Sequence, residues 1–221
     1  MRTLIVIPAR DESALIARCL RSVLDARRAG CRVVVVADSC VDDTAEIAGG
    51  FDGVEVIEVT HANVGAARAA GVAYGLADAE WIASTDADSV VPANWIDDQR
   101  RLALRGADVV VGTVRPVAAD LDERQRAAWT ARHDPTRPNG HVHGANLGIR
   151  ASAYLSAGGF RSLAEHEDTD LVARISSAGG VILAANSSEV ITSGRTFGRT
   201  PGGYARYLRS DLLAESGEAI A

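Results

Sequence analysis

Two acidic residues follow an apolar run in the stretch STDADSVV, residues 84–91. Asp86 and Asp88 flank Ala87, so both carboxylates leave the end of the same expected strand. Carboxylate oxygens are hard ligands that suit Mg²⁺ or Mn²⁺, and such an ion can bridge phosphates while it keeps some of its water. The alternative is a polar strand end that turns into solvent, and the spacing alone does not decide between the two.

A second acidic cluster lies in EHEDTDL, where Glu167, Asp168 and Asp170 open an expected helix. Acidic residues in a first turn offset the helix dipole, which is a purely structural role. A carboxylate in this position can also accept a proton from a nucleophilic hydroxyl. Placed opposite a metal-bound diphosphate leaving group, such a base would be the minimal apparatus for transferring a sugar.

Asp38 also ends an expected strand, at a position where a ribose-binding acid could sit. The first turn, PARDES, lacks the glycines that let a backbone approach a pyrophosphate, which argues against a nicotinamide-dependent dehydrogenase. A P-loop is absent from the sequence as well. A diphosphate bound here would therefore need a cation and arginines.

The elements that must position these residues alternate along the first half of the chain. Short β-branched runs predict strands at 3–9, 32–38, 54–59, 80–88 and 107–114, and the stretches between them predict helices at 12–29, from about 42, at 63–76 and at 94–104. This alternation indicates βαβ units on a parallel sheet that is buried on both faces. In such sheets ligands bind at the carboxyl ends of the strands, where the acidic residues lie.

The second half is less regular. Residues 115–132 are charged and rich in alanine, and HDPTRPNGH (133–141) predicts a loop where substrate contacts could vary. A strand is expected at 144–150, a helix at 167–178, one or two strands at 181–193, and then a tail with glycine and arginine. We expect a single domain over 1–221, with a donor half at about 1–114 and an acceptor half with the C-terminal tail at about 115–221.

Composition limits the partners. The chain has 221 residues, 47% of them apolar, and its 29 acidic residues exceed its 23 basic ones, so a general affinity for nucleic acid or anionic lipid is not expected. Three cysteines without metal-type spacing favour a reducing compartment, and we expect them to be buried thiols. No signal-peptide pattern and no apolar run of roughly 18 residues is present, so we expect a cytoplasmic protein; peripheral contact with the inner membrane face and homodimer formation stay open.

Six motifs in order resemble the family 2 glycosyltransferases of the GT-A fold. They are IPARDE, VVVVADSCVDDT, NVGAARAAG, TDADS, GANLGIRASAYLSAGGF and EDTDLVARI. The resemblance implies a Rossmann-like, mostly parallel central sheet with helices on both faces. It also implies transfer of a sugar from a nucleotide-diphosphate donor to an acceptor hydroxyl, with inversion at the anomeric carbon.

The resemblance assigns roles to particular residues. It implies that the nucleotide and donor are bound by Pro8, Ala9, Arg10, Glu12, Asp38, Arg68, Asp86 and Ala87. Asp88 would hold the divalent cation, Mn²⁺ or Mg²⁺; Asp168 would be the general base, and Glu167 would orient the acceptor or the base. Asp38 could instead form a turn or cap a helix, and Arg68 could instead pair with surface acids.

Several positions depart from the family pattern or have an open role. Asp11 stands where asparagine is commoner, and Arg10 stands where an aromatic residue often stacks on the base. Some members of the family supply a metal-ligand histidine near the C-terminus, but no histidine follows His166 here. Asp88 would therefore share the cation with solvent and phosphate. His141 and His143 could meet the acceptor or the diphosphate, or have no chemical role.

In the C-terminal tail, Arg195 and Arg199 could close over the nucleotide or lie in solvent. The sequence as a whole predicts a metal-dependent, inverting glycosyltransferase of the hexosyltransferase type that uses a UDP or GDP sugar and an acceptor of unknown identity. A sugar-phosphate nucleotidyltransferase and a catalytically silent sugar-nucleotide-binding protein remain as alternatives.

Overall fold

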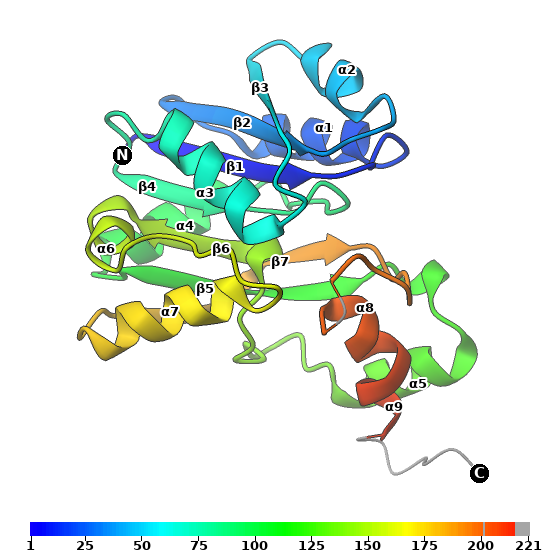
Figure 1. The fold of residues 1–221 in the computed structure, drawn as a ribbon. Helices are drawn as coiled ribbons and strands as arrows, with labels where there is room; N and C mark the ends of the chain where they lie inside the picture. The colour runs from blue at the N-terminus through cyan, green and yellow to red at the C-terminus, as the bar shows by residue number, and fades with distance from the viewer. Residues whose placement is uncertain (201, 215–221) are drawn as a thin grey trace.

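A seven-stranded sheet forms the centre of the molecule (Figure 1), in a computed structural model that describes residues 1–200 and 202–214. The strands are β1 (Thr3–Ala9), β2 (Cys31–Asp38), β3 (Val54–Val59), β4 (Trp81–Ser84), β5 (Val109–Pro116), β6 (Leu147–Arg150) and β7 (Ile182–Thr192). Their order in the sheet is β3-β2-β1-β4-β6-β5-β7. β6 runs antiparallel to β4 and β5, and the other neighbouring pairs are parallel. The predicted α/β fold with a mostly parallel sheet is confirmed.

Helices cover both faces of the sheet. Those of the described chain are α1 (Ile16–Ala26), α2 (Thr44–Gly49), α3 (Val64–Gly75), α4 (Trp95–Leu104), α5 (Glu123–Arg132), α6 (Ala151–Ser156), α7 (Glu167–Ser177), α8 (Tyr204–Arg206) and α9 (Leu212–Ala214). Apolar residues of α1, α2 and α4 pack on one face, and those of α3, α6 and α7 on the other (Figure 1). Because side chains alternate along a strand, Ile5 and Ile7 of β1 enter the first cluster, whereas Leu4 and Val6 enter the second.

A smaller cluster lies at the C-terminal end of the described chain. Leu121 and Ala128 pack there against Leu208 and Leu212 and so join α5 to the last helical turns. The sequence reading of 115–132 did not predict α5. Its start is nevertheless marked by a capping box, in which the Asp122 carboxylate accepts from the Gln125 N–H and the Gln125 side chain accepts from the Asp122 N–H.

Other boundaries also differ from the prediction. The first helix begins at Ile16 rather than at Glu12, because Glu12 lies in the turn after β1, where its N–H donates to Thr44 Oγ1 at 2.8 Å. The segment 144–146 is a short 3₁₀ turn, so only 147–150 is strand. Residues 182–192 form one continuous strand.

The cysteines are free thiols, but only Cys19 is buried; Cys31 and Cys40 are half-buried, contrary to the expectation of three buried thiols. Within residues 1–200 and 202–214, we find no helix with the length and apolar character that a membrane crossing requires.

Candidate functional site

A cavity of about 220 Å³ opens at the carboxyl edge of the sheet, where the turns after β1, β2 and β4 meet. Its lining includes Pro8, Ala9, Arg10, Glu12, Asp38, Ala62, Asn63, Val64, Ala67, Asp86, Ala87, Asp88, Ala164, Arg195, Arg199 and Thr200. The structure thus brings together all the predicted donor and metal residues except Arg68. Parallel strands that end at one edge place their following turns side by side, which is why residues far apart in sequence converge here.

Asp38 is buried and holds the loop that leads into α3. Its Oδ1 accepts from the backbone N–H groups of His61 at 2.7 Å and Ala62 at 2.8 Å, and its Oδ2 accepts from Asn63 N–H at 2.9 Å. Ala62 has a left-handed backbone with φ of 50°, a conformation that these bonds help to maintain. Asp38 therefore shapes one wall of the cavity, which is the turn-forming role left open by the sequence.

Arg68 lies beneath the cavity and is only 3% exposed. Its guanidinium donates to Ser84 Oγ at 3.2 Å, to Asp86 Oδ1 at 2.5 Å and to Glu167 Oε1. Burial lowers the pKa of Arg68, but the charges of Asp86, Glu167 and Asp168 more than offset this, so its pKa is raised. The alternative that Arg68 pairs with surface acids does not hold, because its partners are acids of the site and Glu167 is itself buried.

Asp168 is fixed at the start of α7. Its Oδ2 accepts from Gly144 N–H at 2.6 Å, and its Oδ1 accepts from Thr169 N–H at 2.7 Å. Gly144 approaches Arg68 so closely that an added Cβ would collide with the guanidinium. The absence of a side chain at Gly144 thus lets one backbone segment pass over Arg68 and hold Asp168 next to it.

Glu167 and His143 flank this base candidate. Burial raises the pKa of Glu167; Arg68 opposes this effect and Asp168 adds to it. Burial lowers the pKa of His143 to about 4, although the charge of Asp168 opposes the shift. His143 is therefore a neutral imidazole at neutral pH and can offer one donor and one acceptor.

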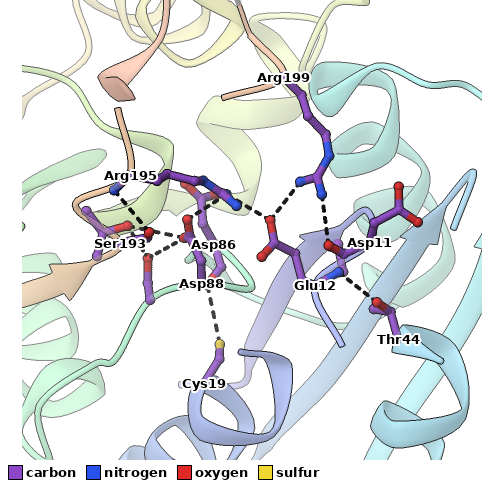
Figure 2. A network of polar contacts seen from close by, with 12 residues as sticks. Asp11, Glu12, Cys19, Thr44, Asp86, Asp88, Ser193, Arg195 and Arg199 are labelled. Atoms are coloured by element: carbon purple, nitrogen blue, oxygen red, sulfur yellow. Dashed lines mark hydrogen bonds and ion pairs between the residues drawn. The ribbon is translucent and has the colours of Figure 1, made fainter. Parts of the chain in front are cut away.

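Two arginines from the C-terminal segment enter the cavity from above (Figure 2). Arg195 Nη2 lies 2.7 Å from Asp88 Oδ2 and 2.8 Å from Glu12 Oε1. Arg199 donates to Glu12 Oε1 at 2.7 Å and to the carbonyl oxygen of Asp11 at 2.8 Å. The tail segment 193–200 is thus tied to the turn after β1 and to the turn after β4.

The carboxylate of Asp88 has a raised pKa. Burial raises its pKa to about 6, the charge of Asp86 adds to the shift, and Arg195 opposes it. Its Oδ1 accepts from Ser89 Oγ at 3.3 Å and from Thr192 Oγ1 at 3.2 Å, so Arg195 is the group that faces Oδ2. A positive charge beside Asp88 Oδ2 is electrostatically favourable, and the guanidinium of Arg195 provides that charge.

The donor set fits a divalent cation only if other ligands complete it. Asp88 offers a single carboxylate, so phosphate and water oxygens would have to supply the remaining positions. Within the described residues, the one group of three close potential ligands is Asp11, Cys40 and Asp42, which does not include Asp88. Two of its carboxylate oxygens already accept backbone N–H groups, from Val41 and from Ser13.

The two unusual residues of the first turn have different positions. Arg10 lines the cavity, and its buried Nε has no hydrogen-bond partner among the residues that the structure describes. Asp11 has a left-handed backbone with φ of 45°, and its carboxylate turns to the loop after β2.

The sequence reading also missed a set of ring side chains in the second half. Trp129, His133, Tyr204 and Tyr207 gather near the two histidines that it did single out. An available signal was the clustering of three of the five histidines between positions 133 and 143, just after Trp129.

Comparison with known proteins gives a family and a set of similar folds. The model of glycosyl transferase family 2 matches residues 4–157. The structure of S. aureus TarS 1–349 in complex with UDP-GlcNAc has a TM-score of 0.73 and 14% identity, with coverage of 100% of this chain and 68% of that one. The mannosyltransferase PcManGT from Pyrobaculum calidifontis, in complex with GDP-Man and Mn²⁺, has a TM-score of 0.72 and 17% identity, with coverage of 100% and 65%.

The chain therefore spans about two thirds of these two solved chains, and it covers 37% of a longer S. aureus TarS chain. At these identities the similarity establishes the fold. A search of curated protein sequences finds no match.

Proposed function

This chain belongs to glycosyl transferase family 2, and from that premise we propose that it transfers a sugar from a nucleotide-diphosphate donor to an acceptor hydroxyl. The donor occupies the cavity at the carboxyl edge of β1, β2 and β4. The observation that carries the proposal is the buried guanidinium of Arg68, which joins Asp86 on the cavity side to Glu167 beside Asp168. A donor-binding acid and a base candidate are thereby held on either side of one fixed charge.

The residues divide the work between binding and proton transfer. The turn 8–12 holds the nucleoside against the wall that Asp38 shapes, Asp86 contacts the sugar or ribose, and Arg195 and Arg199 meet the diphosphate. Asp168 accepts the proton of the acceptor hydroxyl while that oxygen attacks the anomeric carbon opposite the leaving group. The product has inverted configuration, and no covalent bond to the enzyme forms.

Asp88 is the residue that holds a divalent cation, together with phosphate and water. When bound, the cation offsets the negative charge that develops on the leaving nucleoside diphosphate. The two neighbours were solved with UDP-GlcNAc and with GDP-Man and Mn²⁺, which supports a UDP or GDP sugar and Mn²⁺ or Mg²⁺ here. The free cysteines support a reducing, cytoplasmic location.

A thermal-shift panel tests donor binding. UDP-, GDP-, ADP- and dTDP-sugars are compared at equal concentration, each with and without Mn²⁺. We expect one nucleotide to raise the melting temperature and Mn²⁺ to increase that rise, because a ligand that binds only the folded state stabilises it. The absence of any nucleotide response would contradict the proposal.

Asp168→Asn tests the base. The variant keeps the shape of the side chain, and its amide oxygen can still accept from one of the two backbone N–H groups, those of Gly144 and Thr169, that Asp168 binds. Nucleotide binding is therefore expected to persist while transfer falls about 10²–10⁴-fold. Asp170→Asn, two residues along the same helix, is the matched control and should retain transfer. Near-normal turnover by Asp168→Asn would remove it from this role.

A further inference from the structure

A second cavity, of about 330 Å³, lies away from the donor site between α5, the loop that follows it and the C-terminal helical turns. Its walls include four rings, those of Trp129, His133, His141 and Tyr207, and the polar or charged side chains of Arg132, Asp134, Arg137 and Asn139. The volume lies at the lower end of the range of small-molecule sites. Phe, Trp and Tyr make up only 5% of the chain and it has five histidines, so this gathering of rings is a local feature.

The rings hold one another in place. Trp129 stacks on His133 with centroids 5.2 Å apart, and Tyr204 stacks on Tyr207 at 5.9 Å. The edge contact between Trp129 and Tyr204, at 6.5 Å, joins the two pairs. The cavity therefore has a preformed aromatic wall rather than separate mobile side chains.

One path connects this wall to Asp168. His141, which lines the cavity, lies 6.2 Å from His143 between ring centroids, and His143 also contacts Tyr204 at 5.6 Å. The next residue after His143 is Gly144, whose N–H donates to Asp168 at 2.6 Å. The base candidate is thus held by the same short segment that forms part of the cavity wall.

A second path connects the wall to the donor cavity. The C-terminal segment that carries Arg195 and Arg199 continues to Gly202, whose N–H donates to Glu165 Oε2 at 2.6 Å. It then provides Tyr204 and Tyr207 to the ring cluster. Both cavities are therefore lined by one segment, and the contact with Glu165 anchors that segment next to the start of α7.

We propose that the ring-lined cavity binds a saccharide acceptor, a substrate class that rests on the proposed sugar transfer. A pyranose has C–H faces that pack on aromatic rings and hydroxyls at its rim that can bond to Asp134 and Asn139. Asp134 is paired with Arg137 at 2.9 Å and Arg132 also lines the cavity, so the lining also accommodates a saccharide that carries an anionic group. The saccharide extends from this cavity past His141 and His143 to Asp168. There one of its hydroxyl oxygens bonds to the anomeric carbon, its proton passes to Asp168, and the bond to the diphosphate breaks with its electron pair leaving on the diphosphate.

Tryptophan fluorescence reports on this cavity directly. The chain has three tryptophans, and Trp81 and Trp95 are 0% exposed, so a ligand-dependent change in emission points to Trp129. The probes are the methyl glycopyranosides of glucose, galactose, mannose and N-acetylglucosamine, added without donor. We expect at least one to give a saturable change. A flat response to all four would overturn the proposal, and a response to glycerol 3-phosphate alone would assign the cavity to a phosphorylated acceptor instead.

Two variants and a control separate binding from folding. His141→Ala removes an exposed ring and should weaken the saccharide response about 5–10-fold; Trp129→Phe should abolish the fluorescence signal while calorimetric binding of the same glycoside remains detectable. Tyr74→Ala removes a partly exposed ring of α3 on a different part of the surface and should leave the affinity unchanged. Equal affinities in wild type and His141→Ala would contradict the assignment.

The nucleotide thermal shift distinguishes this inference from the proposed function. A nucleotide response without any saccharide response overturns the acceptor site and leaves the donor site standing. A saccharide response without any nucleotide response overturns the proposed sugar transfer, and with it the acceptor role of the cavity.

Discussion

At the residue scale, the acidic side chains of the site have the same chemistry but different surroundings. Asp38 is saturated by backbone N–H groups, Asp86 and Glu167 share Arg68, and Asp88 faces Arg195. A carboxylate that accepts from the backbone is a fixed structural element, whereas one that faces a partly exposed guanidinium can exchange its partner. Asp88 is for this reason the residue on which a metal test should focus.

Asp88→Asn should remove most of the Mn²⁺-dependent part of the nucleotide thermal shift. An amide is a weaker ligand than a carboxylate, so we expect the apparent Mn²⁺ affinity to fall by about 10–100-fold or more. Asp97→Asn removes the same charge from the exposed surface of α4 and should leave the Mn²⁺ effect intact. An unchanged Mn²⁺ effect in Asp88→Asn would exclude Asp88 as a ligand.

His143 should make the free energy of unfolding depend on pH. Its pKa is about 4 in the folded protein and ordinarily 6.5, so between these values the unfolded chain binds a proton that the folded chain does not. The free energy of unfolding should therefore fall as pH decreases from 6.5 to 4, by on the order of 3 kcal/mol from this residue.

Urea unfolding at a series of pH values measures this effect. His143→Gln should show a smaller loss of stability between pH 6.5 and 4 than wild type, whereas a variant of the exposed His61, His61→Gln, should follow wild type. Parallel pH profiles for wild type and His143→Gln would contradict the assignment.

At the scale of elements, the segment 193–200 after β7 is held over the donor cavity by Arg195 and Arg199. Both arginines reach Glu12, but Arg195 alone of the two contacts Asp88. A cation that binds Asp88 Oδ2 must displace the Arg195 guanidinium, which is then available to the diphosphate. Replacing either arginine removes one positive charge, but only replacement of Arg195 also removes a contact with Asp88. Comparing the two variants therefore separates the effect of that contact from the effect of net charge.

Arg195→Gln should bind Mn²⁺ more tightly than Arg199→Gln when no nucleotide is present. Each variant removes one positive charge, but only the first removes the group that competes at Asp88, so we expect an affinity difference of about 10-fold. Electron paramagnetic resonance, which measures the concentration of free Mn²⁺, gives the Mn²⁺ dissociation constants of both variants. Equal constants would show that Arg195 and the metal do not compete.

At the scale of the whole molecule, the two halves of the sequence are interleaved in one sheet. β6 from the second half lies between β4 and β5, and its antiparallel direction brings the turn 144–146 beside the carboxyl end of β4. Arg68 of α3 then joins the turn after β4 to the start of α7. The site depends on this connection because each half supplies one of its two acids.

Arg68→Met should destabilise the fold by about 3–5 kcal/mol, since it leaves the buried Glu167 without its counter-charge. Adding Glu167→Gln should recover part of that loss, which a double-mutant cycle in urea can measure. Arg32→Met breaks an ion pair with Glu55 at the surface and should cost about 1 kcal/mol or less. Similar losses of stability in Arg68→Met and Arg32→Met would mean that the ion pairs of Arg68 with Asp86 and Glu167 do not couple the two halves.

The sequence by itself determined the α/β class, most strands and the acids at their ends. These follow from short-range patterns: apolar runs of strand length, alternation with helical stretches, and polar residues where each run stops. It also indicated that the turns after β1, β2 and β4 meet, because the ends of parallel strands lie at one edge, but it left open whether Arg195 and Arg199 reach the donor cavity. The start of the first helix was placed too early, since the bond between Glu12 N–H and Thr44 Oγ1 joins residues 32 positions apart.

Only the tertiary structure decided which partner each side chain has. The bonds of Arg68 to Glu167 and of Arg195 to Asp88 span 99 and 107 positions, and no local pattern specifies a contact at that distance. The antiparallel direction of β6 and the meeting of Trp129 with Tyr204 likewise depend on how the chain returns to the sheet. Local propensity fixes an element; the partner of a buried charge is fixed by where packing brings distant elements together.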